Sequence, residues 1–451
     1  MQRLKRLLQR KRPKRDEVQR DEQSPAQVPL PTPVVTDSPK TPSLSDLERL
    51  PFEIRNGFLL AIDSITDLSA LVHASPTFHE QYRLDRAFWL WHCLQLEMGH
   101  VFVDAYIANQ CNSPEFRLKR NRERVLLFIE DYKSHRSMIT EVLTKCPDED
   151  EMLSIAAFHS SVIRPLMNHY VSWAHGNMEL LSTPKDISRT EERRIMRGFY
   201  RFQIFSNLFG AVKDVDHGES FLGSEERLSL FLADFMAWEI EEMLCINAFV
   251  QAKYESVFQA IQWDLHPDNP SFDSSRTGPH TPPGTFHLAN HMSSEWYRNG
   301  MVSRGLCVLS SVFKARGHLK LVEVVSEEIV AVVDDLLFRS TLSYYQEARR
   351  ENQHSDRDQA QDDREKMVFS RDSDGSPPLA WVIFWKETYS NLFGDFIPQS
   401  LRQWGYVMWD SDRLVNTDAV ARLDQAWKDM YTEPVHYEAP GDPRDEMLAY
   451  H

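Results

Sequence analysis

Residues 47–78 read LERLPFEIRNGFLLAIDSITDLSALVHASPTF. Apolar residues recur here at three- and four-residue spacing, which predicts a helix beginning beside Pro51, where a proline fits the first turn. A second short helix is predicted to end at Ser75, because the residue before a proline avoids helical backbone angles. The stretch therefore predicts a helical hairpin. Its first apolar set is Leu47, Leu50, Ile54, Phe58, Leu59 and Ile62, and its second is Leu68, Leu71 and Val72.

The hairpin resembles the F-box, and more closely the F-box-like domain of a group of fungal proteins. That resemblance implies the substrate-receptor subunit of a cullin–RING (SCF-type) ubiquitin ligase, with Leu50, Pro51 and Ile54 meeting the adaptor protein and Phe78 supporting them from behind. The alternative is a hairpin that only caps the following domain, since fold resemblance does not carry function. The matching residues are Leu50, Pro51, Glu53, Ile54, Ile62, Ile65, Leu68, Leu71 and Phe78.

Composition places the chain among soluble intracellular proteins. Its 451 residues are 42% hydrophobic and 11% aromatic, which is enough for a sizeable core. No run approaches the roughly 18 apolar residues of a membrane span, and the first residues lack the apolar core of a secretory signal. The five cysteines are scattered and odd in number, which indicates reduced thiols in the nucleus or cytoplasm.

Charge is distributed unevenly along the chain. Residues 1–20 carry nine basic and two acidic residues, a net of +7, so the total of −16 leaves −23 for the other 431 residues. An acidic body argues against a nucleic-acid partner, because such binding depends on neutralising phosphates. The basic cluster of Lys11, Arg12, Lys14 and Arg15 is a candidate nuclear-localisation signal, with a solvated tail as the alternative.

Helical periodicity continues to the C-terminal region, and the predicted fold class is all-α. A capping box at Ser188 and Glu191 predicts the start of a helix that ends near Leu208, before Gly210. The predicted organisation is a disordered tail at 1–43, an F-box-like domain at 44–112, a helical domain at 113–346, a flexible charged insertion at 347–378, an aromatic-rich continuation of the helical domain at 379–430 and an acidic tail at 431–451.

The long loop at 264–290 contains two patterns that can indicate chemistry. Asp264 and Asn269 resemble the base and metal ligand of the catalytic loop in aminoglycoside and choline kinases. The other kinase motifs are missing, so the alternative of turn-capping side chains is favoured. Four histidines also gather here, in an irregular segment where they are usually solvated. We therefore expect no catalytic residue, no metal site and no cofactor. The histidines are His266, His280, His287 and His291.

An aromatic-rich block at 381–409 has two interpretations. Large aromatic side chains usually lie in the core, although they are also enriched where proteins bind one another. Trp404, Tyr406 and Trp409 are flanked by polar residues and are predicted to be the exceptions that contact a client protein. The sequence thus predicts an F-box-like receptor that binds an adaptor and a client. A helical interaction protein without a ligase is the second hypothesis, and a kinase-like enzyme the third.

Overall fold

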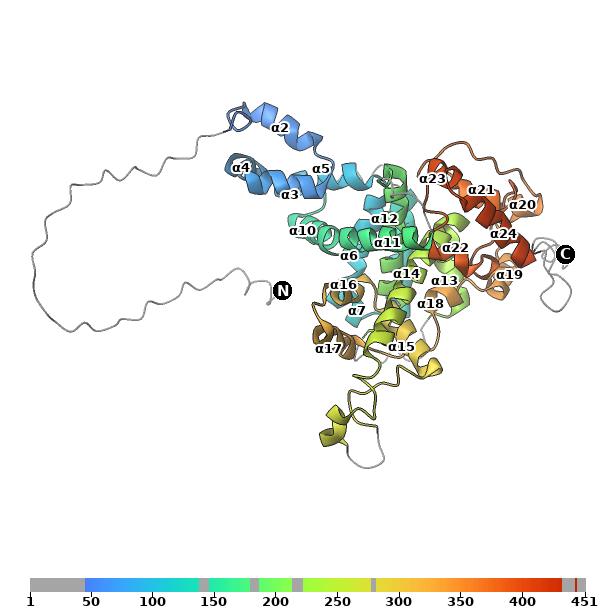
Figure 1. Cartoon of the computed structure of the whole chain (residues 1–451). Helices are drawn as coiled ribbons and strands as arrows, with labels where there is room; N and C mark the ends of the chain where they lie inside the picture. Colours follow the sequence, from blue (N-terminus) through green and yellow to red (C-terminus); the bar gives the residue numbers. More distant parts are fainter. Residues whose placement is uncertain are drawn as a thin grey trace, which may run out of the picture. The chain divides into compact units, whose positions relative to one another are not determined.

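The computed structural model describes residues 45–137, 146–178, 186–212, 222–276 and 281–431, together with Pro443. In these ranges the protein is all-α, which confirms the predicted fold class, and its only β pairing is an isolated bridge between Lys366 and Thr388. Residues from Leu50 onward form one compact unit (Figure 1). None of the described helices combines the length and apolar character needed to cross a bilayer.

The predicted hairpin forms, and side-chain caps mark where its second helix and the helix after it begin. The Ser64 hydroxyl accepts a hydrogen bond from the N–H of Asp67, and the Ser75 hydroxyl accepts one from the N–H of Phe78. Gly99 follows with a φ of +59°, a conformation that suits glycine, and separates the next two helices. These first helices are α2 (Phe52–Ala61), α3 (Ile65–Ala74), α4 (Pro76–Leu84), α5 (Arg86–Met98) and α6 (Val101–Cys111).

The centre of the unit consists of α6, α12 (Arg189–Phe209) and α14 (Ala237–Ile261). Ser188 caps α12 through the predicted capping box, and the helix ends before Gly210, as the sequence predicts. A side chain at Gly210 would meet the Ser303 carbonyl oxygen at 1.9 Å, so the glycine permits a close backbone approach. Most of α12 is buried, including three of its arginines.

One long helical segment crosses this centre and contains a π-helical turn. It consists of α10 (Glu149–Phe158), the π-helix His159–Ile163 and α11 (Arg164–Asn177). The π-turn places the wholly buried His159 against α5 and α12. Around the centre lie α7 (Pro114–Leu118), α8 (Arg122–Ser137), α13 (Ser224–Leu230), the 3-10 turns Leu232–Asp234 and Pro270–Ser275, α15 (His291–Ser303), α16 (Leu306–Lys314) and α17 (His318–Glu328).

The prediction of a flexible insertion at 347–378 is wrong, because its charged side chains are paired with one another and with other parts of the fold. Asp358 is buried and accepts two hydrogen bonds from Arg349, at 2.5 and 2.7 Å. Asp374 pairs with Arg193 of α12 at 3.0 Å. The C-terminal helices are α18 (Leu336–Arg339), α19 (Ser343–Asn352), α20 (Asp356–Asp362), α21 (Leu379–Phe384), the 3-10 turn Gly394–Phe396, α22 (Gln399–Gln403), α23 (Ser411–Val415) and α24 (Ala419–Tyr431).

Three of the predicted domain boundaries fall inside the described part of the chain, and the two predicted tails fall almost wholly outside it. The unit that starts at Leu50 is not divided at residue 112, since α6 packs directly on α12. Nor is it divided at 346 or 379. The tail at 1–43, with Lys11, Arg12, Lys14 and Arg15, lies outside the described residues, as does nearly all of the tail at 431–451.

Candidate functional site

Helix α2 carries apolar side chains on two sides. Leu59 points into the protein and is only 1% exposed, whereas Ile54 is 51% exposed. At 3.6 residues per turn these two side chains lie about 140° apart around the helix. Ile54 shares its side with Phe58 and Ala61, which are also exposed. We call these three residues the outward face of α2; a surface helix normally has one apolar stripe, and here a second one faces outward.

The helix is held in place by polar contacts to α4. The buried Gln81 of α4 accepts a hydrogen bond from Arg55 Nε at 2.9 Å and donates one to the Phe52 carbonyl oxygen at 3.1 Å. It also bonds to the side chain of Asn56. Because these contacts occupy the inner side of α2, the outward face is presented on a fixed helix. The outward face of α2 can therefore pack against an apolar surface of a partner protein.

The four predicted adaptor-binding residues differ in how far they are exposed to solvent. Pro51 is exposed at the start of α2, Ile54 lies on the outward face, and Leu50 is half-buried. Phe78 is only 1% exposed and belongs to the core, so it can act only from behind, as its predicted supporting role requires. Phe58 was predicted on the same helix, and its exposure adds it to the candidate contacts.

The prediction that Trp404, Tyr406 and Trp409 stand outside the core is wrong. All three side chains are buried, and the Trp409 indole N–H donates to the Trp404 carbonyl oxygen at 2.7 Å. Their polar neighbours made them look exposed, but those neighbours are themselves engaged: Asp410 accepts a hydrogen bond from Arg194 at 2.9 Å. Buried rings offer no surface to a client protein.

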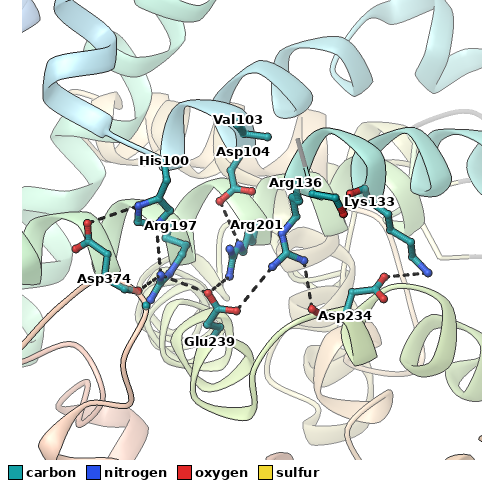
Figure 2. Close-up of a pocket in the computed structure, with 12 residues that line it drawn as sticks. His100, Val103, Asp104, Lys133, Arg136, Arg197, Arg201, Asp234, Glu239 and Asp374 are labelled. Atoms are coloured by element: carbon teal, nitrogen blue, oxygen red, sulfur yellow. Dashed lines mark hydrogen bonds and ion pairs between the residues drawn. The ribbon is translucent and has the colours of Figure 1, made fainter. Parts of the chain in front are cut away.

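A second candidate site is a charged cavity of about 590 Å³ between α6, α8, α12 and α14, shown in Figure 2. Arg197, which lines the cavity, donates two hydrogen bonds to Glu242, at 2.7 and 2.6 Å. Arg201 pairs with Asp104 and with Glu239, each at 3.1 Å. Although burial raises the pKa of Glu239, the charges of Arg201 and Arg197 outweigh it and hold that pKa well below its ordinary value.

At the rim of this cavity the basic side chains also lie next to carboxylates. Lys133 pairs with Asp234 at 2.9 Å, and His100 lies 3.5 Å from Asp374. Burial, together with the charge of Arg197, lowers the pKa of His100 and favours its neutral form. Each basic group of the cavity therefore faces a carboxylate, so the cluster holds helices together and presents no surplus charge to a ligand.

Glu97 of α5 joins the hairpin to the rest of the unit. This buried carboxylate accepts from the backbone N–H of Ile65 at 2.8 Å, at the start of α3. It also bonds to His159 in the π-turn at 3.0 Å and accepts from Arg164 Nε at 2.7 Å. His159 in turn lies 3.0 Å from the Tyr200 hydroxyl on α12. The Glu97 side chain thus ties α3 to the π-turn and α11, and His159 extends this connection to α12.

In the long loop after α14, both residues that resemble a kinase loop have partners within the protein. Asp264 pairs with His318 at 2.9 Å. The Asn269 side chain accepts from the N–H of Ser271 at 2.9 Å and donates to the Trp263 carbonyl oxygen at 2.8 Å, as a turn cap does. His280 lies outside the described residues. Over the ranges that the structure covers, no group of three or more His, Cys, Asp or Glu side chains could hold a metal ion.

The charged network was not predicted, although part of its pattern is visible in the sequence. Arg194, Arg197 and Arg201 recur at three- and four-residue spacing along α12, and Glu239 and Glu242 are three apart on α14. Such spacing puts each set on one helix face. No protein-family model, curated protein or solved structure matches the chain.

Proposed function

We propose that this protein is the substrate-receptor subunit of a cullin–RING ubiquitin ligase, and that its adaptor binds the outward face of α2. The observation that carries the proposal is the exposure of Ile54 and Phe58 on a helix whose opposite side is already packed. Burying a large apolar side chain contributes about 1.5 to 3 kcal/mol. Two such side chains, one turn apart on a helix, can insert into an apolar groove on the surface of the partner.

The surroundings of α2 support a receptor role. A receptor must hold its client at a fixed position relative to the adaptor, which requires that the adaptor-binding helices not swing on the body. The contacts of Glu97 with Ile65, His159 and Arg164 provide that connection from within the fold. The hairpin and the body of the unit are therefore expected to move together.

We assign no catalytic step, cofactor or nucleic-acid partner to this chain. Asp264 and Asn269, the residues that resemble a kinase loop, are engaged in a turn and an ion pair. The acidic balance of residues 21–451 disfavours a phosphate backbone. Adaptor and client proteins remain the partners of the proposal.

The test replaces the outward face without disturbing the fold. Ile54→Glu with Phe58→Glu puts two charges on exposed positions, and glutamate favours helices. Because truncating an interface anchor costs about 2 kcal/mol or more, we expect the double variant to lose co-purification with the adaptor and cullin. Leu118→Glu is the matched control, since Leu118 is equally apolar and exposed but lies on α7.

The result separates the hypotheses. Recovery of adaptor with the parent and with Leu118→Glu, and its loss with the double variant, supports the proposal. Equal recovery with all three proteins contradicts it. If the parent recovers no adaptor from its native cells, the hypothesis of a helical interaction protein without a ligase replaces it. Circular dichroism checks that each variant keeps its helices.

A further inference from the structure

A group of basic side chains lies where α11, α14 and the turn between α16 and α17 come together. Residues 314–320 in that turn read KARGHLK, with three Lys or Arg residues, one histidine and no acidic residue. Gly317 has a φ of +86° and allows the chain to change direction sharply between the two helices. Because residues 21–451 carry a net charge of −23, such a basic stretch differs from most of the protein.

Two other helices bring basic groups to the ring of Phe313 at the end of α16. The imidazole of His169, from α11, stacks on this ring with the two centroids 4.2 Å apart, and Lys253 Nζ, from α14, lies 4.6 Å from the ring centroid. The residue after the ring, Lys314, donates a hydrogen bond from Nζ to the Ser161 carbonyl oxygen at 2.6 Å. We call the following four residues the basic patch: His169, Lys253, Lys314 and Arg316.

The positive charge of the basic patch is not compensated within the described part of the chain. The neighbouring His318 and Lys320 each pair with a carboxylate, at 2.9 and 2.7 Å. In the described ranges, by contrast, no ion pair joins Lys253, Lys314 or Arg316 to an acidic side chain. Lys314 and Arg316 are exposed and Lys253 is half-buried, so a partner can reach the patch from solvent.

The two groups at the Phe313 ring are held in surroundings that disfavour their charge. Burial lowers the pKa of Lys253, and burial together with the charge of Lys253 lowers the pKa of His169. No carboxylate of the described chain offsets either shift. An anion placed beside these groups would raise both pKa values again, because an opposite charge favours the charged form. The patch therefore favours an anionic partner.

We propose that the basic patch binds a short acidic segment, rich in aspartate or glutamate, of a partner polypeptide. Complementary charges across an interface select the partner and speed association. A short segment contacts the patch alone, whereas DNA or a bilayer is an extended anionic surface that also meets the acidic body of the chain and is repelled by it. As a client contact this proposal rests on the proposed receptor function, but binding of the acidic segment does not depend on α2.

The test is calorimetric titration of the full chain with the peptide Ac-Glu-Glu-Gly-Glu-Glu-NH2. Its counterpart Ac-Gln-Gln-Gly-Gln-Gln-NH2 has nearly the same shape and no side-chain charge. Because each exposed ion pair contributes up to about a factor of five in affinity, we expect the glutamate peptide to bind roughly tenfold or more tightly than the glutamine peptide. Equal binding of the two peptides, or no binding of the glutamate peptide, overturns the proposal.

Variants separate binding at the patch from attraction to the basic residues 1–20. Lys314→Gln with Arg316→Gln removes two exposed charges and should weaken the glutamate peptide about tenfold. Arg83→Gln with Lys366→Gln is the matched control, because it removes two other exposed charges, and it should bind the peptide as the parent does. Equal affinity of the patch variant and the control overturns the assignment to this patch.

Lys253→Gln tests whether the site extends to α14. We expect it to weaken the glutamate peptide by about a factor of five. Unchanged affinity in this variant would overturn the inclusion of the Phe313 ring and its two basic neighbours in the site. Melting curves check that the variants keep the fold of the parent.

Two further measurements identify the partner and separate this proposal from the adaptor site. Sedimentation with phosphatidylcholine vesicles that contain phosphatidylserine should be the same for the parent and the variant Lys314→Gln with Arg316→Gln. Reduced sedimentation of that variant would make a membrane the partner and overturn the polypeptide. Ile54→Glu with Phe58→Glu, which changes the net charge by the same two units, should bind the glutamate peptide normally. Failure of adaptor binding and failure of acidic-segment binding are therefore measured independently.

Discussion

At the scale of single residues, Glu97 shows how burial and pairing compete. Burial alone raises the pKa of a carboxyl group, but the hydrogen bond and charge of His159, with the charge of Arg164, outweigh it and lower the pKa of Glu97 from 4.5 to about 2. The unfolded chain binds a proton near pH 4.5 and the folded chain only near pH 2. This contribution to stability is therefore complete above pH 4.5 and is lost as the pH falls toward 2.

The variant Glu97→Gln should show how much the ionised Glu97 carboxylate contributes to the free energy of unfolding. A shift of that size corresponds to roughly 3 kcal/mol, so we expect the variant to lower the free energy of unfolding by about that amount at pH 7. The loss should be clearly smaller at pH 3, where the parent has already lost part of the contribution. Urea unfolding at the two pH values measures both.

The control for Glu97 is Glu115→Gln, which removes a carboxylate from an exposed pair with Lys119. Exposed pairs contribute little, so its unfolding curves should nearly match the parent's at both pH values. An equal loss for Glu97→Gln at pH 7 and pH 3 would contradict the assignment of the lowered pKa to this junction.

Residue partners across the fold were the least predictable feature. Arg201 and Asp104 are 97 positions apart, and Arg197 meets Glu242 across two packed helices. Local periodicity places each residue on a helix face but does not say which faces meet. The arginine set on α12 was therefore visible in the sequence, while the cavity that it closes was not.

At the scale of elements, capping motifs in the sequence predicted where helices begin, whereas the charged composition of one segment led to a wrong prediction of flexibility. The start of α12 follows from the Ser188 capping box, because both partners lie within four residues. The segment at 347–378 looked flexible because it is charged, yet Asp358 is neutralised by Arg349 and accepts from Asn391 Nδ2 at 2.9 Å. A run of charged residues indicates disorder only when those charges find no partners, within the segment or beyond it.

The glycine inside helix α2 leads to a prediction about the stability of the protein. Gly57 lies inside the helix, and an added Cβ would meet no atom within 4 Å. Glycine inside a helix costs about 0.5 to 1 kcal/mol relative to alanine, so Gly57→Ala should raise the free energy of unfolding by that amount. The measurement is urea unfolding of the free protein.

Gly300 inside α15 is the contrasting control. Its added Cβ would lie 2.0 Å from the Val330 carbonyl oxygen, so Gly300→Ala must displace backbone and should destabilise the protein by about 1 to 3 kcal/mol. If both alanine variants shift stability in the same direction, the packing described for one of these two helices is contradicted.

At the scale of the whole molecule, the unit from Leu50 onward is organised around α6, α12 and α14 and not around a separable N-terminal domain. The sequence predicted a boundary at residue 112, because the resemblance ended near there. That boundary is crossed by packing: α6 belongs to the predicted F-box-like domain, yet its buried side chains meet the arginine-bearing helix α12.

The last prediction tests this continuity with a fragment. Residues 50–112 alone would expose the side of α6 that packs on α12, and would leave the Asp104 carboxylate without Arg201 and Tyr132. Glu97 would also lose His159 and Arg164. Each loss is of the kind that destabilises a fold, because apolar surface and unpaired buried charge both carry a cost. We therefore expect the fragment to lack a cooperative melting transition by circular dichroism, whereas residues 45–431 melt cooperatively. A fragment 50–112 that is helical and melts cooperatively by itself would show that the N-terminal helices form an independent domain.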